Sequence, residues 1–189
     1  IKWAEDALKE AAASQEGDAD AARTTAEICA HAHNTLGVAL ARQGHVEQAI
    51  DQIRRSIELA EAHDLARAIC RGCANLGVLY GATDPRRGVA ICAQGLETAK
   101  KSGDLGFQSR LYANLAVVYC AVDDRCAEDG VEAARRAVEL DRRLGYYDHL
   151  AAPLIVLGQI QQCHGDHTEA FASYREAPEI AERVDEPQP

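Results

Sequence analysis

Apolar residues recur three, four and seven positions apart in successive segments of the chain. Ile50, Ile53 and Ile57 show this spacing in one segment, and Val131 and Val138 show it in another. Such spacing places apolar side chains on one face of an α-helix. The pattern therefore predicts a series of amphipathic helices.

Four segments of the chain can be superimposed on one another. Each has a leucine followed by a small residue, and that small residue recurs at intervals of 40, 39 and 42 residues. A second small residue follows 11 to 14 residues later, and a constant 28 residues separate it from the next unit. Since length varies in only one turn, we predict two antiparallel helices per unit, A and B, joined by an exposed A–B turn. The two columns of small residues are Gly37, Gly77, Ala116 and Gly158, and Ala49, Gly88, Gly130 and Ala170.

The units and the turn residues between them set the predicted organisation. Pro153 is expected in the first turn of the last A helix, and Pro178 is expected to kink or fray the last B helix. The predicted segments are a helix that forms a partial repeat (1–16), four repeats (21–64, 65–103, 104–145 and 146–184) and a disordered tail (185–189).

Composition supports an all-α fold and narrows the function. Alanine occupies 36 of the 189 positions and aromatic residues only 5%, which disfavours a sheet. The formal charge of −10 argues against nucleic-acid binding. There is no apolar run of about 18 residues and no visible secretion signal, so we expect a cytoplasmic protein that neither binds nor spans a membrane.

The columns resemble tetratricopeptide repeats. The last unit has Gly158, Gly165, Ala170, Tyr174 and Ala177 at the spacings of that family. The period near 40 resembles the long-helix subclass of kinesin light chains, spindle-orientation adaptors and bacterial regulators. The resemblance implies a right-handed α-solenoid of about four hairpins plus an N-terminal helix, whose concave face is lined by the A helices.

The resemblance also implies which A-helix positions contact a ligand: two and six residues before the first small column, and one after it. At these positions Arg71 lies one helical turn before Asn75, and Arg110 lies one helical turn before Asn114. An asparagine amide can bond an extended backbone, and an arginine can bond a carboxylate. We predict a groove for an acidic peptide, formed by His31, Asn34, Arg71, Asn75, Val78, Arg110, Asn114, Val117 and Gln159.

A purely structural interpretation of the same residues stays open. The asparagines could satisfy neighbouring helix ends, and the arginines could pair with acidic residues of the B helices. His31 and His33 are expected on different faces of their helix, at the surface or in the groove.

The seven cysteines suggest no catalytic or metal chemistry. An odd number excludes complete pairing within one chain. Cys70 and Cys73 form a CxxC within a helix, which we interpret as core rather than redox. Cys163, His164 and His167 lie in one turn, near which Cys120 and Cys126 could lie. Cysteine and histidine ligands would suit zinc, and that alternative stays open, but we interpret the turn as polar, without metal.

The sequence predicts a non-catalytic scaffold for protein–protein interactions, with no cofactor and no metal. Its partner would be a protein, bound through an extended or helical acidic peptide in the groove. The alternative is a sensory or regulatory segment of a larger signalling ATPase, cyclase or transcription regulator. Exposed end helices leave room for self-association.

Overall fold

The computed structural model describes residues 1–6, 19–122 and 126–185, and these residues form helices and turns without strands. Residues 2–6 are helical. The helices that follow are α2 (Ala19–Arg42), α3 (Val46–Ala62), α4 (Ala66–Thr83), α5 (Pro85–Ser102), α6 (Leu105–Tyr119), the π-helix η1 (Cys126–Gly130), α7 (Val131–Leu144), α8 (Tyr147–Cys163) and α9 (His167–Asp185).

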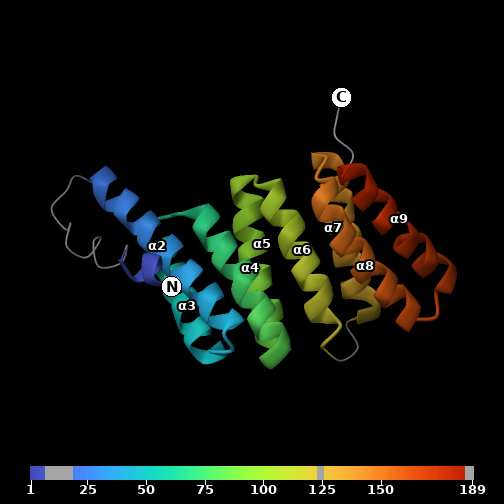
Figure 1. The fold of residues 1–189 in the computed structure, drawn as a ribbon, viewed down its shortest axis with the longest axis horizontal. Coiled ribbons are helices and arrows are strands. Elements are labelled where there is room, and N and C mark those ends of the chain that lie inside the picture. Colours follow the sequence, from blue (N-terminus) through green and yellow to red (C-terminus); the bar gives the residue numbers. More distant parts are fainter. Residues whose placement is uncertain (7–18, 123–125, 186–189) are drawn as a thin grey trace.

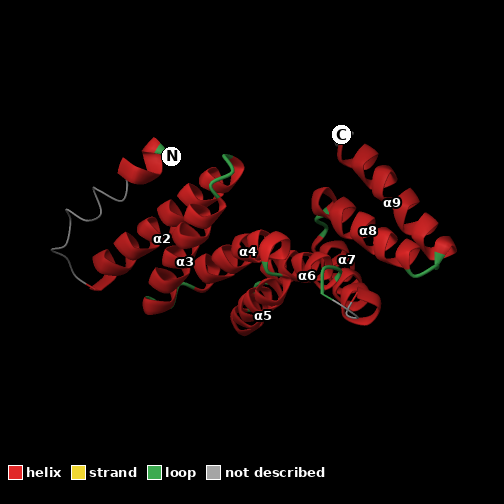
Figure 2. Cartoon of the chain, turned by 90° about the horizontal axis from the view of Figure 1, so that it is seen from below, coloured by secondary structure: helices red, strands yellow, loops and turns green. Residues whose placement is uncertain are grey.

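Consecutive helices pack as hairpins, and the hairpins follow one another along the long axis of the molecule (Figure 1). The first helix of each hairpin also contacts the first helix of the next, so α2, α4, α6 and α8 form a continuous row. Figure 2 shows the helices following an arc, with α5 on its outer side and α4 and α6 on its inner side. The array is an α-helical repeat fold, as the sequence predicts.

Small residues let the two helices of a hairpin approach closely. A Cβ atom on Gly37 would lie 2.5 Å from Ile53 Cγ1, and one on Gly77 would collide with the Cys92 sulfur. At Gly158 the same atom would lie 2.8 Å from the Tyr174 ring. Non-bonded carbon atoms settle at about 3.5–4.0 Å, so only glycine fits these crossings. The first column of small residues is therefore a packing feature.

Capping residues lie at the starts and ends of several helices, where the sequence places turn residues. The side chains of Asp84 and Asp104 accept hydrogen bonds from backbone N–H groups of α5 and α6. Gly103 and Gly145 follow α5 and α7 with positive φ angles of 71° and 68°. Glycine adopts this left-handed conformation without a steric penalty, which makes it a frequent helix terminator.

The buried apolar side chains form a core along the length of the array. The main cluster extends from Ala26 in α2 to Ile160 in α8, and a smaller cluster joins Val138, Leu154 and Ala177 in the last two hairpins. Each cluster draws on neighbouring hairpins, so burial at every point depends on adjacent repeats.

The prediction for Pro153 was wrong. Helix α8 begins at Tyr147, so Pro153 lies in its second turn and not its first. Helix α9 continues past Pro178 to Asp185, so the helix does not end at this proline, and the kink expected there stays a prediction. The remainder of the predicted helix 1–16, beyond residue 6, and residues 186–189 of the predicted tail lie outside the described residues.

Candidate functional site

Four side chains on α4 and α6 form hydrogen bonds to the preceding helix of the inner row; we call this set the polar ladder. Arg71 Nη1 on α4 lies 2.6 Å from His31 Nδ1 on α2. A guanidinium has only donors, so His31 accepts at Nδ1 and holds its ring proton on Nε2. That Nε2 lies 3.7 Å from Glu27 Oε1, which favours this tautomer.

The asparagines continue the polar ladder. Arg110 Nη2 donates to Asn75 Oδ1 at 3.0 Å, and Asn75 Nδ2 donates to Asn34 Oδ1 at 3.0 Å. Asn114 Nδ2 donates to the carbonyl oxygen of Ala74 at 2.8 Å. The polar ladder therefore joins α2, α4 and α6 through side chains that the sequence assigned to one groove.

Arg71 and Arg110 have no carboxylate partner within the described part of the chain. Arginines of α7 differ, because Arg136 and Arg142 both contact glutamates. Burial, and then the positive charge of Arg71, lower the pKa of Arg110. The two guanidinium groups therefore concentrate positive charge that described acidic residues do not neutralise.

These contacts test the purely structural interpretation of the arginines and asparagines against the interpretation as a peptide groove. The arginines do not pair with acidic residues of the B helices, so this part of the structural interpretation is wrong. The asparagines do bond neighbouring helices, although within the helices and not at their ends. Each still has one N–H that no described hydrogen bond uses.

The remaining predicted residues differ in exposure. Val78 and Val117 are 57% and 54% exposed. Gln159 is also exposed, on α8, whereas Asn34 is buried and reaches the inner face only through Asn75. His33 lies on another side of α2 from His31, with its Nδ1 2.8 Å from Gln52 Oε1 of α3.

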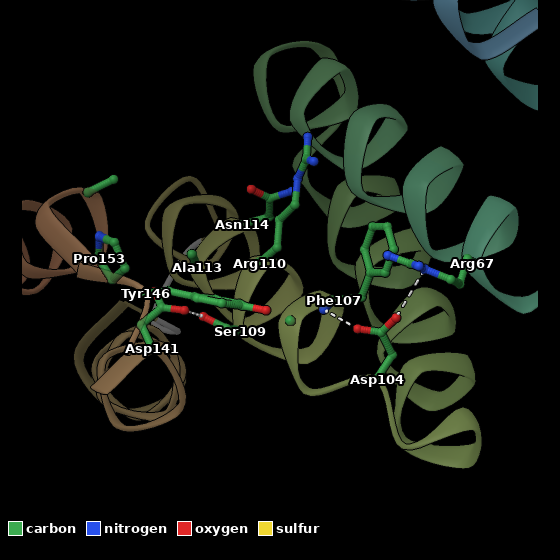
Figure 3. Close-up of a pocket in the computed structure, with 12 residues that line it drawn as sticks. Arg67, Asp104, Phe107, Ser109, Arg110, Ala113, Asn114, Asp141, Tyr146 and Pro153 are labelled. Atoms are coloured by element: carbon green, nitrogen blue, oxygen red, sulfur yellow. Dashed lines mark hydrogen bonds and ion pairs between the residues drawn. The ribbon is translucent and has the colours of Figure 1, made fainter. Parts of the chain in front are cut away.

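A cavity of about 610 Å³ opens beside Arg110 and Asn114, between α6 and α8 (Figure 3). Phe107, Ala152 and Pro153 contribute apolar surface to it. The cavity lies beyond Arg110, toward α8. At the position that Arg71 has in α4 and Arg110 has in α6, α8 has the small residue Ala152. Only Arg110 and Asn114 of its lining were predicted.

Most polar groups of the cavity already have partners. Asp104 accepts a hydrogen bond from the Phe107 N–H at 3.0 Å and lies 3.4 Å from Arg67 Nε. Ser109 Oγ donates to Asp141 Oδ1 at 2.5 Å, and both residues are buried. Sequence reasoning missed these residues, since Asp141 and Asp104 reach the cavity from other helices and turns.

The CxxC cysteines lie in the core, as predicted. Cys70 and Cys73 are fully buried, and burial raises their pKa to about 11 and about 12. Among the described residues, no group of three or more His, Cys, Asp or Glu side chains is placed to hold a metal ion. None of the described helices combines the length and the apolarity that crossing a membrane requires.

Known structures share this architecture. BtubC (BKLC) from P. vanneervenii has a TM-score of 0.80 and 18% identity, over 98% of this chain and 73% of that chain. The MamA RS-1 ArsTM double mutant has a TM-score of 0.60 and 18% identity, over 97% of each chain. No protein-family model and no curated protein sequence matches this chain. The two structures are helical-repeat proteins, and at this identity the likeness shows the fold.

Proposed function

We propose that this chain is a non-catalytic interaction scaffold that binds an acidic peptide segment along the inner face of α2, α4 and α6. Its repeats would be tetratricopeptide repeats of the long-helix subclass. The observation that supports the proposal best is the pair Arg71 and Arg110, which belong to one polar ladder and lack a carboxylate partner among the described residues.

Charge supports an acidic ligand. The protein has a formal charge of −10, yet two adjacent arginines stand on its inner face. Hydrogen bonds to His31 and Asn75 hold the guanidinium groups in place and leave most of their N–H donors for a ligand. Carboxylates of a peptide are the complementary groups.

Apolar contacts would add to the affinity. Val78 and Val117 expose methyl groups one helical turn from Asn75 and Asn114. The free N–H groups of the asparagines can bond peptide carbonyls, while the valines contact apolar peptide side chains. An acidic segment with interspersed apolar residues therefore suits the surface better than a purely acidic one.

The test compares the parent with an Arg71→Ala and Arg110→Ala double variant. The probe is a fluorescein-labelled peptide of alternating glutamate and leucine, and binding is measured by fluorescence anisotropy. Since a hydrogen bond to a charged group contributes about 1.5–3 kcal/mol, we expect the double variant to bind at least about tenfold more weakly. The affinity of the parent should also fall as salt increases.

Two controls isolate the inner face. An Arg55→Ala and Arg86→Ala variant makes the same change in charge at exposed arginines of α3 and α5, and should bind like the parent. A peptide with glutamine in place of glutamate should bind weakly to every variant. Equal binding of the glutamate peptide by the parent and the inner-face variant would refute the proposal.

A further inference from the structure

Two cysteine sulfur atoms lie unusually close together at the third A–B turn. The Sγ atoms of Cys120 and Cys126 are 2.7 Å apart, and both residues have free thiols. Non-bonded carbon atoms settle at about 3.5–4.0 Å, and sulfur is larger than carbon. A disulfide bond is about 2.05 Å long, so this separation lies between contact and bond.

The local structure holds the two sulfur atoms in this arrangement. Cys120 directly follows α6, and its Sγ donates a hydrogen bond to the Ala116 carbonyl oxygen at 3.2 Å. Cys126 is the first residue of η1. Cys120 is exposed and Cys126 is partly exposed, so a small reagent can reach the pair.

We propose that Cys120 and Cys126 form a reactive dithiol, which low-molecular-weight disulfides such as oxidised glutathione convert into an intramolecular disulfide. This modification site is separate from the polar ladder and does not depend on peptide binding. The disulfide would join the end of α6 to the start of η1.

The reaction consists of two thiol–disulfide exchanges. The thiolate of one cysteine attacks a sulfur of the small disulfide, forms a mixed disulfide and releases one small thiolate. The second cysteine then attacks the protein sulfur of the mixed disulfide and releases the other small thiolate. The protein loses two protons and two electrons, and the small disulfide is reduced to two thiols.

The surroundings of Cys120 disfavour its thiolate. Partial burial, the hydrogen bond with Cys126 and the charges of Cys126 and Cys163 raise the pKa of Cys120 to about 12. Its thiolate is therefore scarce while both thiols of the pair are free. When Cys126 is in a mixed disulfide, its hydrogen bond and its charge no longer disfavour the Cys120 thiolate, which can then close the disulfide.

The chain contains its own comparison sites. Cys163 is exposed and close enough to affect the pKa of Cys120, so it is the competing partner. Cys70 and Cys73 are also close in sequence, but both are fully buried within α4. We expect the buried pair to remain reduced under conditions that oxidise Cys120 and Cys126.

Trypsin allows a direct test, because Arg125 lies between Cys120 and Cys126 in the sequence. The full chain is incubated with oxidised glutathione, free thiols are blocked with N-ethylmaleimide, and the denatured protein is digested without reduction. Mass spectrometry should then find peptide 111–125 linked to peptide 126–135. The same linked pair should form in Cys163→Ser and be absent from Cys120→Ser and Cys126→Ser.

Other products would overturn the proposal. These are blocked thiols or glutathione adducts on both cysteines of the parent, or a link between peptides 111–125 and 144–175, which would pair Cys120 with Cys163. A link between peptides 68–71 and 72–86 would show that Cys70 and Cys73 react as readily, and would remove the distinction on which the proposal rests.

Discussion

At the scale of single residues, the chemistry of the neighbours fixes the orientation of Asn75. Arg110 can only donate, so the Asn75 atom that it contacts is the oxygen. The amide nitrogen then faces Asn34 and donates to its oxygen. Since Arg110 bonds the oxygen of Asn75, the position of this arginine on the inner face depends on the asparagine.

Two glycines offer a residue-scale test of helix crossing. A Cβ atom on Gly95 in α5 would lie 2.6 Å from Cys73 Cβ and 3.1 Å from a Leu111 methyl group. We expect Gly95→Ala to lower the free energy of unfolding by about 1–3 kcal/mol, measured by urea denaturation, because the core must shift.

Gly106 is the matched control. It also lies in a helix, but its added Cβ atom would lie 3.5 Å from Asp104 Oδ1, which is an ordinary contact. Alanine favours helix by up to about 1 kcal/mol over glycine, so Gly106→Ala should leave stability unchanged or raise it slightly. Equal effects of the two substitutions would contradict the close crossing at Gly95.

At the scale of elements, a helix cap fixes where α6 begins. Asp104 caps α6 and also contacts Arg67, whose guanidinium carbon lies 5.9 Å from the centre of the Phe107 ring. One aspartate therefore positions both the start of α6 and an edge of the cavity.

Capping by Asp104 can be separated from its charge. We expect Asp104→Ala to lower the free energy of unfolding by about 0.5–2 kcal/mol, because the Phe107 N–H loses its acceptor. Asp104→Asn keeps a capping oxygen and should cost less, since the exposed pair with Arg67 contributes little. Thermal or urea unfolding of both variants gives the comparison, and a larger loss in Asp104→Asn would contradict the capping role.

The elements also show how far the sequence pattern could predict the structure. The glycine columns were informative because the lack of a Cβ atom at Gly37 or Gly77 matters only where another helix crosses. The start of α8 was not predictable from Pro153, because proline in a second turn leaves little trace in the pattern. The bond between Asn75 and Asn34 depends on the offset between two helices, which sequence spacing does not specify.

At the scale of the whole molecule, stability is shared between neighbouring hairpins. Helix α9 packs against α8, and Leu154 in α8 belongs to the small core cluster at this end. Leu111 in α6 belongs to the main cluster in the middle of the array. Repeat arrays with neighbour contacts can lose structure at one end while the rest remains folded.

Hydrogen exchange measured by mass spectrometry can test this division. Each change, Leu154→Ala or Leu111→Ala, removes a buried leucine and should cost about 2–5 kcal/mol locally. We expect Leu154→Ala to increase exchange in α8 and α9 while α4 and α5 stay protected. Leu111→Ala should increase exchange in the central helices, and a uniform increase in both variants would indicate a single cooperative unit.

At the scale of the whole molecule, the repeat pattern of the sequence could not predict the cavity or the close approach of the cysteine pair. The cavity forms where Ala152 replaces the arginine of earlier repeats, but its size depends on the distance from α6 to α8. Cys120 and Cys126, whose sulfur atoms approach each other, flank the one turn whose length varies between repeats. Repeat periodicity describes what the units share, and both features arise where one unit differs.

The polar ladder has a direction. In each of its four bonds the donor belongs to the later helix and the acceptor to the earlier one, from Arg71 to His31 and from Arg110 to Asn75. The bond dipoles therefore point the same way along the array and do not cancel. The inner face is therefore polar along its length. A peptide chain bound in one direction meets the partial charges in a different order from a chain bound in the opposite direction.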